Sequence, residues 1–189
     1  MMSLQKNLMH GKQFVNMEKS KIYLSKIINM NTKINTKIRC IEVEKIKNPD
    51  VLANVVFNNF IYLKEFPELM HNKKDIIKSL NSEGNLCYLM YDKNNLIAYL
   101  IGEFRTLPDN RYGYYISYLY VLKSYRDKKL GSSLMNRIIS KCQKTGVNFI
   151  LLTCDTKDEK IVQFYRKYGF VIDPSLGGEK RHNVYCLYL

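Results

Sequence analysis

The stretch that decides the fold is YYISYLYVLKSYRDKKLGSSLMNRII, residues Tyr114–Ile139. Its first part, Tyr114–Leu122, is a run of Tyr, Ile, Leu and Val without Pro or Gly, which favours a buried strand. From Leu130 onward, apolar residues recur with helical spacing as far as Cys142. The sequence therefore predicts a strand that leads into a helix through a short basic turn.

The turn, Arg126–Ser133, has the properties of a phosphate site. The first N–H groups of a helix have no partner within the helix, and the positive end of the helix dipole points outward there. Gly131 allows a ligand to approach closely, and Arg126, Lys128 and Lys129 add positive charge. An ordinary helix start is the alternative interpretation of the turn alone.

The turn resembles motif A of the GNAT (GCN5-related) N-acetyltransferases. That motif reads Gln/Arg-x-x-Gly-x-Gly/Ala and holds the pyrophosphate of acetyl-CoA. Arg126–Gly131, which reads RDKKLG, matches it except at Lys129, where the family usually has its first glycine. The departure exchanges an unhindered backbone N–H for one more cation.

A second motif of the same family follows. Phe149–Cys154 is an apolar run of strand length, and apolar residues then recur with helical spacing through Asp155–Gly169, where Gly169 is expected to end the helix. The end of that segment, Phe164–Phe170, resembles motif B, which ends in Phe/Tyr-Tyr-x-x-x-Gly-Phe. The two motifs in this order are more specific than either one, and the resemblance extends over Leu86–Val171.

The rest of the chain supplies the remaining elements. We expect a first strand at Ile38–Glu44, a helix with Asp50 as its N-cap that continues to Leu63, a second helix at Lys73–Leu80, a hairpin of Leu86–Tyr91 and Leu96–Phe104 across Asp92–Asn95, and a last strand at Asn183–Leu189. The predicted fold class is α/β: a single-domain GNAT fold over residues 37–189, with a mixed, mostly antiparallel, twisted sheet flanked by helices.

Composition limits the other function classes. The chain has 189 residues and a formal charge of +13, and residues 1–36 contain six Lys and one Glu, so we interpret them as a basic N-terminal extension. A transit peptide is the alternative there, disfavoured because the segment has no Arg. No helix-turn-helix, zinc-finger or RNP-type motif accompanies the charge, so nucleic acid is not an expected partner.

Cysteine and histidine usage points to a cytoplasmic protein without a metal. The five cysteines are scattered and odd in number, which predicts reduced thiols in the core. No CxxC pair is present, and His10, His71 and His182 are far apart in the sequence, so we expect no metal site and surface positions for all three. No apolar run is long enough to predict a membrane span. A nuclear location and a homodimer are left open.

The resemblance implies direct transfer of an acetyl group from acetyl-CoA to a primary amine, without a covalent enzyme intermediate. It implies that Tyr165 is the general acid toward the CoA sulfur, with a core aromatic as the alternative, and we expect the N–H of Val121 to donate to the thioester oxygen. Asp158 stands where relatives often have an Asn that touches pantetheine. The residues implied to contact acetyl-CoA are Val121, Leu122, Arg126, Asp127, Lys128, Lys129, Leu130, Gly131, Ser132, Ser133, Asp158 and Tyr165.

The general base and the acceptor amine stay open at this level. Tyr115 in Tyr115-Ile116-Ser117-Tyr118-Leu119 resembles a catalytic Tyr of NatE-type protein N-terminal acetyltransferases, but Thr153 stands where that group has a His. Gly169–Ser175 resembles the NatD type, which has Thr at that position. Glu103 is the fallback base, with a surface carboxylate as the alternative. A protein α-amine is the first expectation, a small amine (an amino sugar or polyamine) or a protein lysine the second, and a non-catalytic CoA-binding or nucleic-acid-interacting protein the third.

Overall fold

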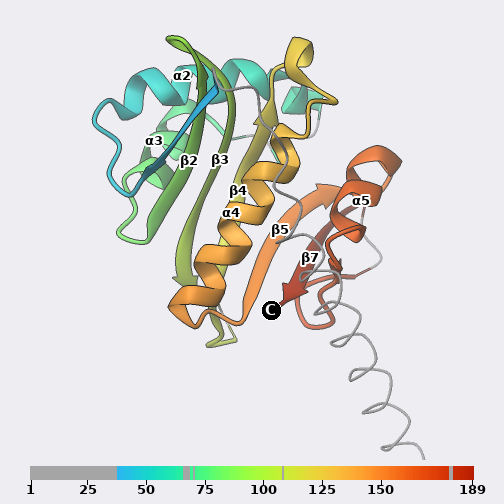
Figure 1. Ribbon diagram of the computed structural model, residues 1–189. Coiled ribbons are helices and arrows are strands. Elements are labelled where there is room, and N and C mark those ends of the chain that lie inside the picture. The colour runs from blue at the N-terminus through green and yellow to red at the C-terminus, as the bar shows by residue number, and fades with distance from the viewer. Residues whose placement is uncertain (1–37, 66–68, 70, 108, 179–180) are drawn as a thin grey trace, which may run out of the picture. The chain divides into compact units, whose positions relative to one another are not determined.

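The computed structural model describes residues 38–65, 69, 71–107, 109–178 and 181–189 (Figure 1). These residues fall into two compact units, one that ends at Arg137 and one that begins at Ile138. Helix α4 (Leu130–Thr145) begins in the first unit and ends in the second. The basic extension predicted at residues 1–36 lies outside the described residues.

The first unit contains an antiparallel sheet whose strands pair in chain order. Its strands are β1 (Ile38–Val43), β2 (Asn85–Asp92), β3 (Asn95–Thr106) and β4 (Tyr112–Val121). The hairpin predicted across Asp92–Asn95 is confirmed, and Lys93 in its turn has a φ of 55°, the left-handed conformation that such turns use. The strand predicted at Tyr114–Leu122 is also confirmed as β4, which begins two residues earlier than predicted, at Tyr112.

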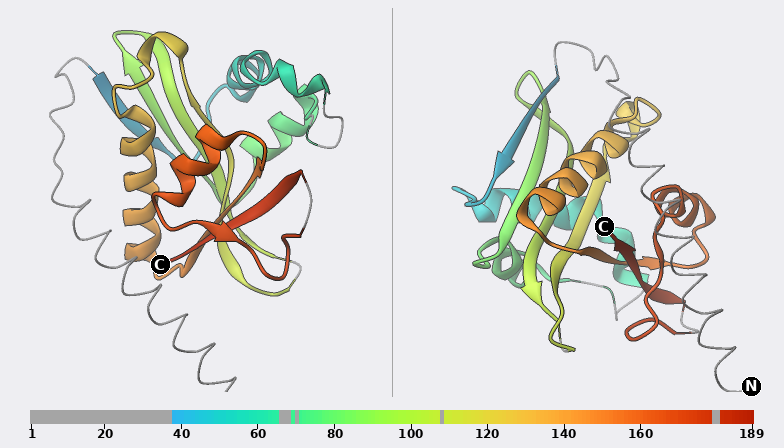
Figure 2. Two further views of the ribbon diagram at one scale, coloured as in Figure 1. Left: turned by 90° about the vertical axis from the view of Figure 1, so that its right-hand side faces the viewer. Right: turned by 60° about the horizontal axis from the view of Figure 1, so that its bottom comes forward.

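Two helices and a 3₁₀ turn cover one face of this sheet: α2 (Pro49–Asn59), η1 (Ile61–Glu65) and α3 (Lys73–Leu80). Figure 2 shows them on one side of the strands, with the start of α4 on the other side. The core beneath α2 and α3 consists of Leu52, Ala53, Val56, Ile76, Leu80, Cys87, Leu89, Tyr99, Ile101 and Tyr118. Strand residues at every second position supply the sheet side of this core, as the pleat of a strand requires.

The predicted start and end of α2 were wrong. The helix begins at Pro49 after Asn48, and Asp50 lies in its first turn, where a carboxylate stabilises the helix through the dipole without capping it. Pro49 fits the first helical position because it needs no hydrogen-bond partner for an N–H. The helix stops at Asn59 instead of continuing to Leu63, because consecutive Asn residues have low helix propensity and the side chain of Asn59 donates to the hydroxyl of Tyr99.

The second unit contains β5 (Phe149–Asp155), α5 (Glu159–Arg166), the short strand β6 (Val171–Ile172) and β7 (His182–Tyr188). Strand β7 pairs antiparallel with both β5 and β6. Helix α5 is shorter than the predicted segment, and its C-cap is Lys167, two residues before the expected Gly169. Gly169 instead turns the chain out of the helix with a φ of 93°, so that the Phe170 N–H returns to the Tyr165 carbonyl.

All five cysteines are free thiols, as predicted, and four of them are buried. Across the described ranges, no helix combines the length and the apolar character that crossing a membrane needs.

Gly102 in β3 is a position where even one added methyl group should be costly. A Cβ added there would lie 2.4 Å from the Tyr115 carbonyl oxygen and 2.5 Å from the Tyr114 hydroxyl, closer than real contacts allow. We expect Gly102→Ala to lower the free energy of unfolding by about 1–3 kcal/mol in urea denaturation. Gly178→Ala is the control, since its Cβ would meet nothing within 4 Å. Equal stability of the two variants would contradict the packing of β3 against β4 described here.

Candidate active site

Strand β4 contains a β-bulge in the middle of its pairing with β3. Ile101 pairs with Tyr118, whereas Gly102 pairs with Ile116, so Ser117 is the extra residue. A bulge of this kind shifts the alternation of side chains along the strand that contains it.

The bulge places Tyr115 and Tyr118 on the same face of the sheet. Their partners in β3, Glu103 and Ile101, are two residues apart and therefore share a face. Burial raises the pKa of the Tyr118 hydroxyl, and the nearby Tyr115 raises it further. Tyr118 is therefore a neutral phenol at physiological pH, on the same face of the sheet as Tyr115.

Tyr115 and Glu103 both interact with Arg105. The Arg105 guanidinium lies 4.0 Å from the centre of the Tyr115 ring, and its Nη1 lies 3.1 Å from a carboxylate oxygen of Glu103. Glu103, the fallback base, is thus an ion-paired carboxylate.

At the end of β4, the backbone N–H of Val121 points away from the neighbouring strand β3. Val121 pairs with Ala98, and the next N–H, that of Leu122, donates to the Ile97 carbonyl at 2.8 Å. Bonds on either side of a pair mark it as a non-hydrogen-bonded pair, whose own N–H and C=O groups point away from the partner strand. The Val121 N–H is therefore directed away from β3, as an oxyanion donor must be, while the Leu122 N–H is used within the sheet.

The basic turn after β4 is held in an unusual backbone conformation. Asp127 and Lys129 have φ values of 61° and 59°, in the left-handed region that favours glycine. This explains why glycine is common at the position of Lys129, and it shows that the chain keeps the same backbone path without it. Arg126 donates from Nε to the Val121 carbonyl at 3.2 Å, and the Lys128 ammonium lies 4.7 Å from the centre of the Tyr125 ring.

Helix α4 starts directly after this turn. Its first helical hydrogen bond runs from the Ser133 N–H to the Lys129 carbonyl, so the N–H groups of Leu130 and Gly131 come before it. Arg126, Lys128 and Lys129 are exposed around this helix start. Exposed cations and a helix N-terminus together suit an anionic phosphate group.

The other two predicted site residues, Asp158 and Tyr165, lie in the second unit on or beside α5. Asp158 is the N-cap of that helix, and its carboxylate accepts from the Ile161 N–H at 3.1 Å. Tyr165 is buried, and its ring packs edge-on against Phe164 and Phe170 with centroid distances of 5.2 and 5.5 Å. Both residues therefore have structural contacts, and their roles toward acetyl-CoA stay predictions.

Cysteine chemistry is disfavoured in the described residues. Burial raises the pKa of the Cys87, Cys142 and Cys154 thiols to about 12. A thiol protonated at neutral pH is a poor nucleophile.

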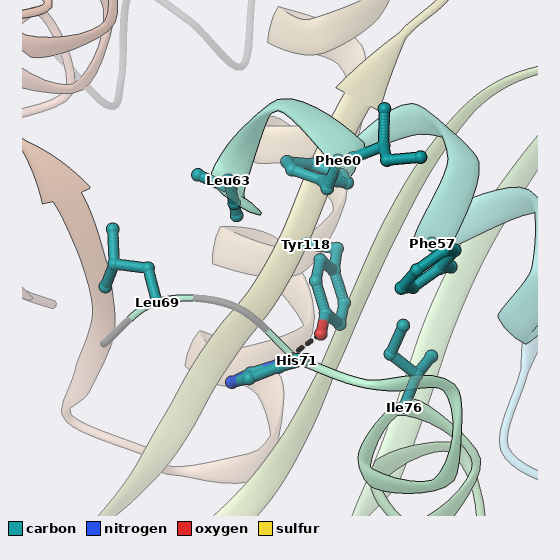
Figure 3. Close-up of a pocket in the computed structure, with 8 residues that line it drawn as sticks. Phe57, Phe60, Leu63, Leu69, His71, Ile76 and Tyr118 are labelled. Carbon is teal, nitrogen blue, oxygen red and sulfur yellow. Dashed lines mark hydrogen bonds between the residues drawn. The ribbon is translucent and has the colours of Figure 1, made fainter. Parts of the chain in front are cut away.

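The sequence analysis missed a polar pair, His71 and Tyr118. His71 is exposed, as expected, but its Nδ1 forms a hydrogen bond with the Tyr118 hydroxyl (Figure 3). The pair lies at a pocket lined by Phe57, Phe60, Ile61, Leu63, Leu69, His71, Ile76 and Tyr118. The two residues are 47 positions apart, so no local pattern connects them.

The surface position predicted for His182 was wrong, and His10 lies outside the described residues. The His182 side chain is only 8% exposed, and its Nε2 lies 3.8 Å from a carboxylate oxygen of Asp155. Its place in β7, opposite Asp155 in β5, explains the burial. In the part of the chain that is described, no group of three or more His, Cys, Asp or Glu residues could hold a metal ion.

A family model described as the acetyltransferase (GNAT) family matches residues 56–170. The chain belongs to the GNAT acetyltransferase family. It is an acetyl-CoA-dependent N-acetyltransferase with acetyl-CoA as its co-substrate. The fold class expected from the sequence is confirmed.

Individual relatives are distant. The uncharacterized N-acetyltransferase ycf52 of Gracilaria tenuistipitata var. liui is 23% identical over 162 residues, which span 81% of this chain and 87% of that protein. Arabidopsis thaliana Naa50, in complex with the bisubstrate analogue CoA-Ac-MVNAL, is 20% identical with a TM-score of 0.60, covering 82% of this chain and all of that one. An aminoglycoside acetyltransferase from an uncultured soil metagenomic sample is 16% identical with a TM-score of 0.57, covering 72% and 90%. Such structural likenesses establish the fold, and the acceptor must be argued from the site.

The left-handed backbone at Lys129 leads to a test with a matched pair. Lys129→Gly and Lys129→Ala remove the same charge, but only glycine adopts a positive φ without a steric cost. We expect the Gly variant to be more stable than the Ala variant by about 1 kcal/mol in urea denaturation, because the left-handed conformation costs an L-residue roughly that much. Equal stability would show that this GNAT protein does not hold the turn in the left-handed form.

Proposed function

We propose that this GNAT protein acetylates the α-amine of protein N-termini. The observation that carries the proposal is the chemistry of the pocket at Tyr118. Six of its eight lining residues are apolar, and His71 and Tyr118 are its polar groups, without a carboxylate. The chemistry of this lining matches an apolar group beside a single ammonium group.

Charge supports a peptide acceptor over a polycation. Polyamines and aminoglycosides carry several positive charges, and sites for them need carboxylates. The chain has a formal charge of +13, and a strongly basic protein repels polycations over long range. Glu103, the carboxylate on the same sheet face, is already paired with Arg105. A peptide with one amine is the acceptor least affected by this repulsion.

We assign the following roles to the residues of the site. The turn Arg126–Ser133 binds the phosphates of acetyl-CoA, which supplies the acetyl group. The Val121 N–H donates to the thioester oxygen as that atom gains charge. Tyr165 gives a proton to the departing sulfur, and Tyr115 orders the acceptor amine on its side of β4.

The acceptor assignment is tested by turnover with a panel of amines. We expect Met-Val-Asn-Ala-Leu to be acetylated with a kcat/KM at least about 10-fold above that of spermidine, glucosamine or an Nα-blocked lysine peptide, a difference of about 1.4 kcal/mol. The Nα-acetylated form of the same peptide is the control and should give no turnover. Donor binding is tested in parallel by thermal shift: acetyl-CoA at about 100 times its Kd should raise the free energy of unfolding by roughly 2.7 kcal/mol. A preference for spermidine or glucosamine would contradict the proposed acceptor, while the thermal shift tests donor binding alone.

The role of Tyr165 is tested by removal of its hydroxyl. We expect Tyr165→Phe to lower kcat about 10²-fold with little change in melting temperature, the scale for loss of a positioned acid. Tyr168→Phe is the control, because Tyr168 is also buried and its ring packs against the same Phe164. An unchanged kcat for Tyr165→Phe at saturating acceptor would assign Tyr165 to the core.

A further inference from the structure

The acetylation chemistry needs a proton acceptor that the other candidates supply poorly. An amine at neutral pH is an ammonium ion and must lose a proton before it can attack a thioester. Glu103 is held in an ion pair, the phenol of Tyr118 is neutral, and the hydroxyl of Thr153 is no base at physiological pH. An imidazole is the side chain best suited to this step.

His71 has the position and the fixed orientation of such a base. It directly precedes Asn72, whose side chain accepts the Asp75 N–H at 2.9 Å and so caps α3. Its ring meets the Tyr118 ring edge-on, with centroids 5.7 Å apart and planes at 87°. The capped helix start and the bond to Tyr118 hold the imidazole in one place over β4.

The two ring nitrogens of His71 have different surroundings. Nδ1 is hydrogen-bonded to the Tyr118 hydroxyl. Figure 3 shows the other nitrogen, Nε2, turned away from Tyr118. When Nδ1 carries the ring proton and donates it to the phenol oxygen, Nε2 holds the lone pair. The exposure of His71 allows an acceptor to reach that nitrogen.

The bulge at Ser117 brings this pair to the side of the sheet where the acceptor is expected. It places Tyr118 on the same face as Tyr115, and α2, η1 and α3 cover that face around the pocket. Without the extra residue, either Tyr115 or Tyr118 would point to the opposite face. The apolar residues of the pocket lie beside the imidazole.

We propose that His71 is the general base of the reaction and that Tyr118 is a positioning residue that fixes its tautomer. The proposal rests on the amine acetylation proposed above. Nε2 takes one proton from the acceptor ammonium, and the neutral nitrogen attacks the thioester carbon. A C–N bond forms and the C–S bond breaks; the second proton leaves the nitrogen and ends on the CoA sulfur. His71 then releases its proton to water, so the net products are the acetamide, CoA and one proton.

The charged and titratable groups around the pair come from two elements. Tyr115 and Tyr118 belong to β4, and Asp75 of α3 interacts electrostatically with Tyr118. Lys73, also of α3, has its ammonium 5.4 Å from the centre of the Phe57 ring.

The decisive experiment compares pH profiles of kcat with acetyl-CoA and Met-Val-Asn-Ala-Leu. The wild-type rate should fall toward low pH, because a protonated ring accepts no proton. We expect His71→Asn to lower kcat by about 10²-fold or more and to lose that limb, with the KM for acetyl-CoA unchanged. His182→Asn, in β7, is the matched control and should keep the wild-type profile.

Two further variants separate chemistry from folding. Added imidazole should restore part of the activity of His71→Ala, which a purely structural role would not allow. Tyr118→Phe keeps the ring and should move the acid limb with a smaller loss of kcat. If His71→Asn keeps the wild-type kcat and pH profile, or if imidazole restores nothing to folded His71→Ala, the proposal is wrong. If the wild-type protein acetylates none of the amines, the proposed function is wrong, and so is the role of His71 as its general base.

Discussion

The extra residue in β4, Ser117, is the constraint on which the first unit depends. Antiparallel pairing alternates side chains strictly between two faces, and only an inserted residue changes that alternation. Here it places Tyr115 and Tyr118 on one face, with Tyr118 in the core beneath α2 and α3. The strand can therefore bury one Tyr in the core and keep the other, half-buried, beside Arg105. The pocket and the hydrogen bond to His71 both follow from that arrangement.

The turn after β4, Arg126–Ser133, brings cations close to the start of helix α4. Two of its residues take the left-handed conformation, which has a cost for any side chain with a Cβ. At Lys129 the chain accepts this cost and gains a positive charge beside the first N–H groups of α4. The helix start therefore has a side-chain cation as well as backbone N–H groups, whereas a glycine would leave the backbone alone.

The proton chemistry of the molecule is divided by burial and pairing. Burial keeps the thiols of Cys87, Cys142 and Cys154 protonated, and ion pairing occupies Glu103. The imidazole of His71, in contrast, is accessible and is oriented by its hydrogen bond to Tyr118. A GNAT protein that has Thr153 on β5 thus has another side chain suited to deprotonating an amine.

The sequence by itself determined the order of strands and helices, the basic turn and the family, because these depend on local periodicity and on motifs within short stretches. It placed the bounds of α2 and α5 less well, since details of capping decide that α2 begins at Pro49 and ends at Asn59 and that the C-cap of α5 is Lys167. Only the tertiary structure decided the bulge at Ser117 and the contact of His71 with Tyr118. A bulge is a property of the pairing between two strands, and that contact joins residues 47 positions apart, so neither leaves a periodic signal in the chain.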